Sequence, residues 1–175
     1  PRRCIWCHHR CRRRCRRRGC GGQGAVAKLR EQGVELAHRL LPVANTEVVH
    51  GILDIRNNNA LGAIGAGNVT TASTGAQLLI NGTNGALTIN ETLRANGVGV
   101  NNGGAIRSIG ASNTINNDMF FDGVTRITNA TDGTTLTLNG NLDEDNTIPG
   151  GGAEQLQFDT VGTANIIDLN GQILG

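Results

Sequence analysis

The chain has 175 residues, enough for one domain with its own core, and its formal net charge of +2 hides two oppositely charged parts. Residues 1–30 carry eleven Lys and Arg and no acid, whereas residues 31–175 carry five Arg and all fourteen acids. No run of about 18 apolar residues is present, so the sequence predicts no membrane-spanning segment.

Residues 1–23 form an Arg- and Cys-rich tract that holds all five cysteines of the chain. The tract has no apolar periodicity, so we expect it to be disordered and to add nothing to a core. Cys4-x-x-Cys7 is followed by His8 and His9, as at the start of a zinc site. No second pair of that spacing follows and the neighbouring arginines oppose a cation, so no metal site is predicted there.

The same tract is the strongest positive run of the chain. Phosphates attract such a run without sequence preference, and Trp6 is the only aromatic side chain there for stacking on bases. Nucleic-acid binding is therefore expected to be non-specific, through Arg10, Arg12, Arg13, Arg14, Arg16, Arg17 and Arg18. The tract lacks an apolar segment, so no signal peptide is expected in this chain.

Residues 24–42 are predicted to form a short helix or a linker. Three leucines recur seven and four residues apart, which places them on one helix face: Leu29, Leu36 and Leu40. Pro42 ends the pattern, because proline cannot continue a helix. We therefore expect the helix to cover Ala25 to Leu41.

From Asn45 onward the period changes to that of short β-strands. Pairs of apolar residues are separated by one residue, so both side chains of a pair face the same way. The pairs are Leu78 and Ile80, Leu87 and Ile89, Leu136 and Leu138, Leu156 and Phe158, and Ile167 and Leu169. Residues that tolerate positive φ separate them, as in Asp122-Gly123 and Asp132-Gly133. Residues 45–175 are therefore predicted to be mainly β.

Two architectures fit these strands. An antiparallel sandwich or barrel is one, because Asn-Gly is the favoured hairpin turn. A solenoid is the other, because apolar-x-apolar-Asn-Gly recurs at Leu78–Gly82, Leu136–Gly140 and Ile167–Gly171. The segment has room for about six irregular coils of roughly 20 residues each.

In a solenoid the apolar side chains of successive coils stack inward, and each contributes about 1.5–3 kcal/mol when buried. The residues between the apolar pairs, such as Thr88, Thr137 and Gln157, are expected to face solvent. A coil cannot bury its own apolar face, so both ends of the stack are predicted to be open edges that favour association.

A resemblance to a known family begins at Asn45. Thr46, Val48, Gly51 and Leu53 fall in the places of a Gly-x-Thr-x-Val-x-x-Gly-x-Leu-like line, which resembles the autotransporter-associated β-strand repeat. Similar continuations follow at residues 59–62, 67–70, 74–78, 101–107 and 133–140. The resemblance implies a right-handed parallel β-helix that serves as the passenger of a bacterial protein and is exported by a C-terminal β-barrel.

The chain departs from the family pattern, with no signal peptide, no barrel and no intact half-repeat before Asn45. Lys28 to Val43 has the length of that half-repeat but not its residues. Because GC-rich coding read out of frame yields Arg and Cys runs, we hypothesise that residues 1–43 are an out-of-frame translation. Sequencing the gene tests this hypothesis, which requires an upstream β-repeat peptide in another frame.

No catalytic motif is found in residues 45–175, and no catalytic, cofactor-binding or metal-ligating residue is predicted. Asp143-Glu144-Asp145-Asn146 is the densest acidic run, but Ile148 takes the place of the glycine that a calcium loop needs. His50 is the only histidine of the segment, and we expect it to be an ordinary strand or turn residue. Asn-x-Thr sequons occur at Asn68, Asn81, Asn90 and Asn129.

These patterns favour a structural, non-enzymatic passenger segment with an adhesive role, on the cell surface or outside the cell. The expected partners are a surface or glycan ligand, which the sequence does not identify, and the neighbouring coils of a longer parent chain. Two alternatives stay open: a fragment of a carbohydrate-active β-helix enzyme, and a nucleic-acid binder that uses the basic tract.

Overall fold

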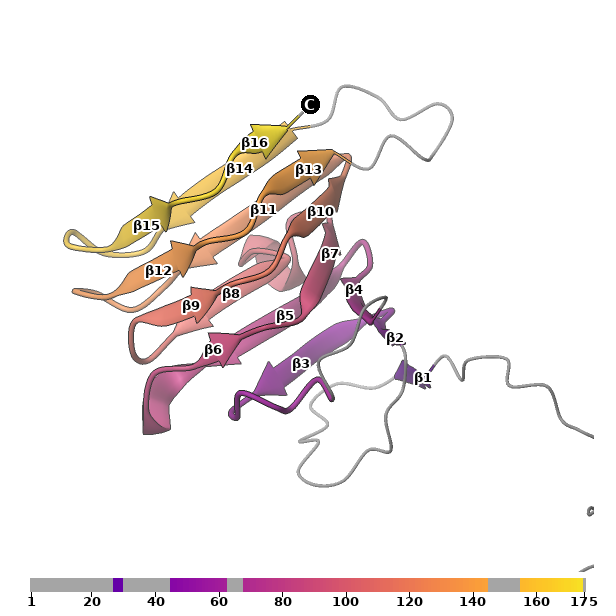
Figure 1. The fold of residues 1–175 in the computed structure, drawn as a ribbon, viewed down its shortest axis with the longest axis horizontal. Coiled ribbons are helices and arrows are strands. Elements are labelled where there is room, and N and C mark those ends of the chain that lie inside the picture. The colour runs from indigo at the N-terminus through magenta and orange to yellow at the C-terminus, as the bar shows by residue number, and fades with distance from the viewer. Residues whose placement is uncertain (1–26, 30–44, 63–67, 145–154, 175) are drawn as a thin grey trace, which may run out of the picture.

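The computed structural model describes residues 27–29, 45–62, 68–144 and 155–174, which are almost entirely strand and turn. The strands form three parallel sheets, which we call sheets A, B and C (Figure 1). Every strand pairing among the described residues is parallel. The mainly β prediction is confirmed, and an antiparallel sandwich is excluded for this part of the chain.

The three sheets contain seven, five and four strands. Sheet A contains β1 (Ala27–Leu29), β2 (Asn45–Val48), β4 (Val69–Ala72), β7 (Thr92–Asn96), β10 (Met119–Asp122), β13 (Leu142–Glu144) and β16 (Ile173–Leu174). Sheet B contains β3 (Gly51–Ile55), β5 (Ala76–Asn81), β8 (Ile106–Ile109), β11 (Val124–Asn129) and β14 (Gln155–Thr160). Sheet C contains β6 (Thr88–Ile89), β9 (Asn113–Ile115), β12 (Thr135–Leu138) and β15 (Ile166–Leu169).

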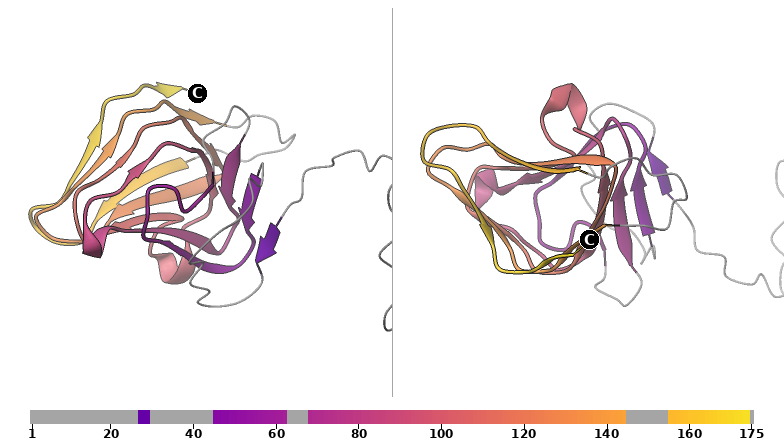
Figure 2. Two further views of the ribbon diagram at one scale, coloured as in Figure 1. Left: turned by 60° about the horizontal axis from the view of Figure 1, so that its bottom comes forward. Right: turned by 90° about the horizontal axis from the view of Figure 1, so that it is seen from above.

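The chain passes through sheets A, B and C in turn and then returns to sheet A, so three successive strands form what we call a rung. Four complete rungs lie within the described residues, starting at β4, β7, β10 and β13. Figure 2 shows them stacked one over another around a common interior. Two short 3-10 helices, η1 (Gly82–Asn84) and η2 (Val100–Asn102), lie in the connections between strands.

The rungs are longer than the sequence predicts. Equivalent asparagines on four successive rungs are 26, 23 and 31 residues apart, not about 20. The extra length lies in connections such as the one that contains η2. The estimate of about six coils is accordingly too high for the described residues.

The predicted helix over Ala25 to Leu41 is wrong where the structure describes it. Ala27–Leu29 is strand β1, in which Ala27 pairs with Thr46 and Leu29 with Val48. The edge of β2 presents unpaired backbone groups, and a parallel strand satisfies them, which outweighs the helical spacing of the leucines. The rest of segment 24–42 and the tract 1–23 lie outside the described residues.

The core is built from stacked aliphatic side chains, as predicted. In sheet B, Leu53, Leu78, Ile106 and Ile127 lie one above another in register, and all four are buried. Leu136 and Leu138 of sheet C are buried in the same way. The intervening residues Thr88, Thr137 and Gln157 are half-buried, because neighbouring rungs flank them on the outer faces.

The last rung, β13–β15, and β16 above it differ from the rungs below. Phe158 pairs with Ile127 and Leu169 pairs with Leu138, yet the two outer members of these pairs are each 38% exposed. The inward direction predicted for Leu156 and Phe158 is correct, but burial is incomplete because only one side is covered. The predicted open edge is therefore present at this end.

Glycine follows two of the sheet C strands, β12 and β15, for a steric reason. A Cβ atom on Gly140 would lie 2.2 Å from the carbonyl oxygen of Asn117, and one on Gly171 would lie 2.0 Å from the carbonyl oxygen of Gly140. At these two positions the backbones of successive rungs approach too closely for a side chain. This contact explains the glycines after Asn139 and Asn170, whereas Glu91 and Asn117 take the equivalent places after β6 and β9.

Candidate functional site

Polar side chains mark the corners between sheets, and the first is a buried asparagine. Asn113 is 0% exposed at the start of β9. Its Oδ1 atom accepts a hydrogen bond from the Leu87 amide at 2.8 Å, and its Nδ2 atom donates to Ser108 Oγ at 2.9 Å. The side chain thus satisfies backbone and side-chain groups where the chain turns from sheet B to sheet C.

Asn129 has the equivalent role in the next rung. It is fully buried at the end of β11, and Nδ2 donates to the carbonyls of Thr134 and Ile166 at 2.9 and 3.0 Å. The second of these bonds joins two neighbouring rungs. These buried amides fix the corner and leave no side-chain group free for a ligand.

A second set of asparagines forms a ladder on the outside of the molecule, just after sheet C. Asn116 Nδ2 donates to Asn90 Oδ1 at 2.6 Å, Asn139 Nδ2 donates to Asn116 Oδ1 at 2.8 Å, and Asn170 Nδ2 donates to Asn139 Oδ1 at 2.9 Å. We call this the asparagine ladder. It is mostly solvent-exposed and connects four rungs.

The interior contains one buried carboxylate among the described residues, Glu91, immediately before β7. The Thr70 hydroxyl donates to Glu91 Oε1 at 3.2 Å, and both residues are buried. Burial raises the pKa of Glu91 above its usual value, and the Thr70 hydrogen bond partly offsets that rise. The arrangement favours the protonated acid inside the stack.

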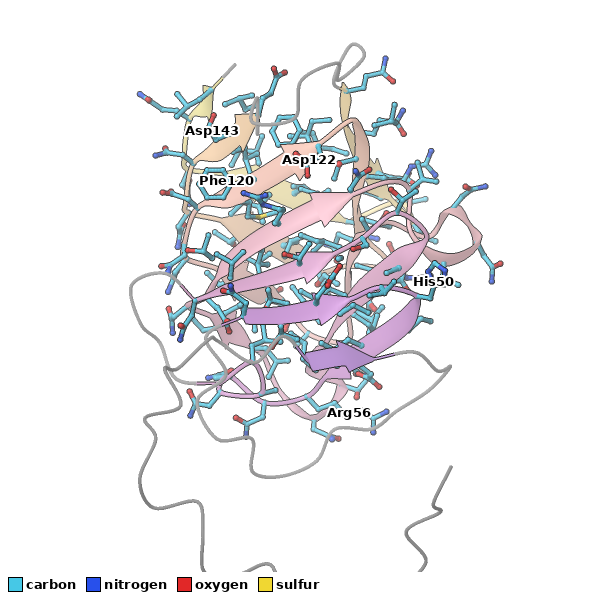
Figure 3. All side chains as sticks on the ribbon, turned by 90° about the vertical axis from the view of Figure 1, so that its right-hand side faces the viewer. His50, Arg56, Phe120, Asp122 and Asp143 are labelled. Atoms are coloured by element: carbon cyan, nitrogen blue, oxygen red, sulfur yellow. The ribbon has the colours of Figure 1, made fainter. Side chains whose placement is uncertain are left out.

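The outer face of sheet A carries an aromatic side chain, Phe120 of β10. Phe120 lies between Arg94 and Asp143 in register, and the Arg94 guanidinium carbon is 6.0 Å from the ring centroid. Figure 3 shows Phe120, Asp122 and Asp143 near one end of this face, with His50 and Arg56 well away from them. His50, in the bend between β2 and β3, and Arg56, after β3, therefore do not belong to the group around Phe120.

The outer face of sheet B is covered in part by the η2 connection. Gln77 Nε2 donates to the Gly104 carbonyl at 2.7 Å, and Arg126 Nη1 donates to the Asn102 carbonyl at 2.9 Å. Arg126 also donates twice to Gln157 Oε1, at 3.2 and 3.0 Å. These contacts hold the connection against the sheet.

The acidic run considered for calcium is only partly described. Asp143 and Glu144 are half-buried in β13, whereas Asp145 and Asn146 lie outside the described residues. No group of three His, Cys, Asp or Glu side chains close enough to hold a metal occurs in the described part of the chain. His50 is exposed in the bend before β3, where its Nδ1 atom lies against the Val49 carbonyl.

The sequons are unequally accessible. Asn129 is fully buried, and Asn81 is nearly so, with its Oδ1 atom accepting from the Thr83 amide and hydroxyl. Asn90 belongs to the asparagine ladder, and Asn68 is half-buried. Asn81 and Asn129 therefore have structural roles, and their side chains are not available as glycan acceptors in the folded chain.

The asparagine ladder has a sequence signal that the apolar pairs alone do not reveal. Thr-Ile-Asn occurs at residues 88–90 and 114–116, Thr-Leu-Asn at 137–139, and Asp-Leu-Asn at 168–170. Aligning these four tripeptides gives the register of sheet C. No comparable signal marks Asn113 or Glu91 as inward-facing.

Searches of protein-family models, curated proteins and solved structures found no match to this chain. Among the described residues, no helix is long and apolar enough to cross a membrane.

Proposed function

We propose that this chain is a structural segment of a right-handed parallel β-helix, the rod of a surface-displayed or secreted passenger of autotransporter type. The observation that carries the proposal is the repeated register: each strand of a sheet pairs in parallel with the equivalent strand one rung away. A solenoid of this kind extends by adding rungs and presents long faces, as a stalk requires.

The contacts between rungs support a mechanical role. Aliphatic side chains stack along the interior, and the asparagine ladder connects the same rungs on the outside. Buried Asn113 and Asn129 lock the corners between sheets. The asparagine ladder and the two buried asparagines thus hold one rung to the next.

The last rung is suited to receive another rung. Its inward-facing side chains Phe158 and Leu169, together with Ile173 of β16, are 38 to 59% exposed, and each lies above a buried partner. A further coil of a longer parent chain would have the shape and register needed to cover these side chains. This role matches the expected passenger segment, in which each stretch is stabilised by its neighbours.

Antibodies raised against the chain test surface display. The proposal predicts that they label intact cells of the source organism, and that protease added outside the cells removes the signal. Labelling that appears only after the cells are permeabilised would contradict it. An abundant cytosolic protein, probed in the same samples, is the control for cell integrity.

The two alternatives are separated by assays on the parent protein. A carbohydrate-active enzyme would release reducing ends from a panel of polysaccharides, and the structural proposal predicts no release. A nucleic-acid binder would hold DNA at low salt through the basic tract, and removal of residues 1–24 would abolish that retention.

A further inference from the structure

The outer face of sheet C presents a regular array of neutral polar groups. Thr88 pairs with Thr114, and Thr114 pairs with Thr137, so three threonines project outward from successive rungs. The asparagine ladder runs beside them, two residues further along each strand. Figure 1 shows strands β6, β9, β12 and β15 stacked to form this face.

The array has two fixed repeats. Neighbouring strands are about 4.8 Å apart, and alternate residues of one strand are about 6.6 Å apart. The positions of the asparagine amides are fixed by their mutual hydrogen bonds, and each amide nitrogen keeps a second N–H for solvent. The hydroxyls of Thr88, Thr114 and Thr137 make no hydrogen bond within the described residues, so they too are available to an outside group.

The composition of this face narrows the kind of ligand. It carries no Lys or Arg, so it offers nothing to phosphate or to an acidic polymer. It carries no aromatic ring on which a sugar could stack. On the last rung it carries its only charge, Asp168, and one exposed apolar side chain, Ile166. What remains is a ligand that is neutral, rigid and periodic, and that both donates and accepts hydrogen bonds.

We propose that the outer face of sheet C, formed by the threonine column and the asparagine ladder, binds the surface of crystalline water. Hydroxyls and amides held at constant spacing order first-shell waters with the same two repeats. Water ordered in this way joins an ice lattice, and this face lacks the aromatic rings on which a neutral polysaccharide would stack. The proposal depends only on the register of sheet C and is independent of the proposed passenger function.

Ice recrystallisation assays and thermal hysteresis measurements on the full 175-residue chain test the proposal. The wild-type chain is expected to slow the growth of ice grains at concentrations where serum albumin has no effect. Thr114→Tyr and Thr137→Tyr each place a bulky ring in the centre of the array. The ring keeps the side chains of neighbouring rungs from contacting the ice surface. Because the rungs act together, each substitution is expected to raise the concentration needed by on the order of tenfold.

Thr71→Tyr is the matched control. Thr71 is also a half-buried threonine at the centre of a strand, but it lies on the outer face of sheet A between Glu47 and Arg94. This variant is expected to retain full ice activity. Circular dichroism and unfolding midpoints confirm that each variant folds, and Thr88→Tyr replaces any array variant that does not.

Three outcomes would overturn the proposal. The first is a wild-type chain no more active on ice than serum albumin. The second is a Thr71→Tyr variant that loses as much activity as Thr114→Tyr. The third is retention on crystalline cellulose that Thr114→Tyr abolishes while ice is unaffected, which would assign this face to a neutral polysaccharide.

Discussion

Strands β12 and β15 have nearly the same sequence pattern and very different surroundings. Leu138 is 1% exposed in β12, whereas Leu169, its register partner in β15, is 38% exposed. Leu136 is likewise buried and its partner Ile167 only half-buried. The exposure of these side chains differs because β12 has a neighbouring strand on each side and β15 on only one.

This difference shows where the stability of the stack lies. An inward-facing side chain is removed from water only when a rung covers it from both directions, so the same residue type contributes more in a middle rung than in the last one.

The largest effect is expected from the core of sheet C. Leu136→Ala removes a fully buried side chain and leaves a cavity, and it should lower the free energy of unfolding by about 2–5 kcal/mol. Ile167→Ala, its register partner in the last rung, should cost about 1 kcal/mol or less. Urea unfolding of the two variants measures both values, and equal losses would refute the comparison.

The buried corner asparagine gives the next largest effect. Asn113→Ala leaves the Leu87 amide and Ser108 hydroxyl without their partner, at an expected cost of about 1–3 kcal/mol. Asn170→Ala removes only the exposed end of the asparagine ladder and should stay within about 0.5 kcal/mol of wild type. Urea unfolding measures both changes. A loss at Asn170 as large as that at Asn113 would mean that the ladder, not the corner, fixes the rungs.

The buried carboxyl group of Glu91 should make the free energy of unfolding depend on pH. Its pKa is raised in the folded state, so its stabilising contribution is fully present below its usual value and is lost as pH rises through the raised value. Glu91→Gln stays neutral and keeps an acceptor for Thr70. The variant should therefore gain stability over wild type as pH rises above the usual value for glutamate, measured by urea unfolding. A difference that does not change with pH would show that burial does not perturb Glu91.

At the open end formed by the last rung and β16, we expect the smallest effect on stability. The effect on self-association there should be clear. Ile173 is 59% exposed in β16, so Ile173→Ser should change the free energy of unfolding by about 0.5 kcal/mol or less. It should also reduce self-association in sedimentation velocity, because it makes the open rung more polar. Val48→Ser, at a buried position in β2, is the control, and it should lower stability without specifically reducing association.

The sequence predicted the strands and turns well because their signals are local. Pairs such as Leu78 and Ile80 face inward, and Gly123 and Gly133 have positive φ at the predicted turns. It did not separate parallel from antiparallel pairing, because Asn-Gly serves a hairpin and also the close approach of rungs at Gly140. That choice depends on contacts between residues 23 to 31 positions apart.

Other features had no local signal. The leucine spacing around Leu29 predicted a helix, and pairing with β2 overrode it at Ala27–Leu29. Glu91 and Asn113 look like surface residues in the sequence, yet both are buried with hydrogen-bond partners from other strands or turns. The polar face of sheet C is different, because the repeated Thr-Ile-Asn and Thr-Leu-Asn tripeptides mark it in the sequence.

The proposed rod depends most on parallel pairing between equivalent strands of successive rungs, and nuclear Overhauser effects test this most directly. Parallel pairing predicts contacts between the amide proton of Asn139 and the α-proton of Ile115, whose carbonyl accepts that amide at 2.8 Å. It also predicts contacts between Asn170 and Leu138, whose carbonyl accepts the Asn170 amide at 2.9 Å. Cross-strand contacts between β11 and β12 across the Asp132-Gly133 turn, as in an antiparallel hairpin, would contradict it.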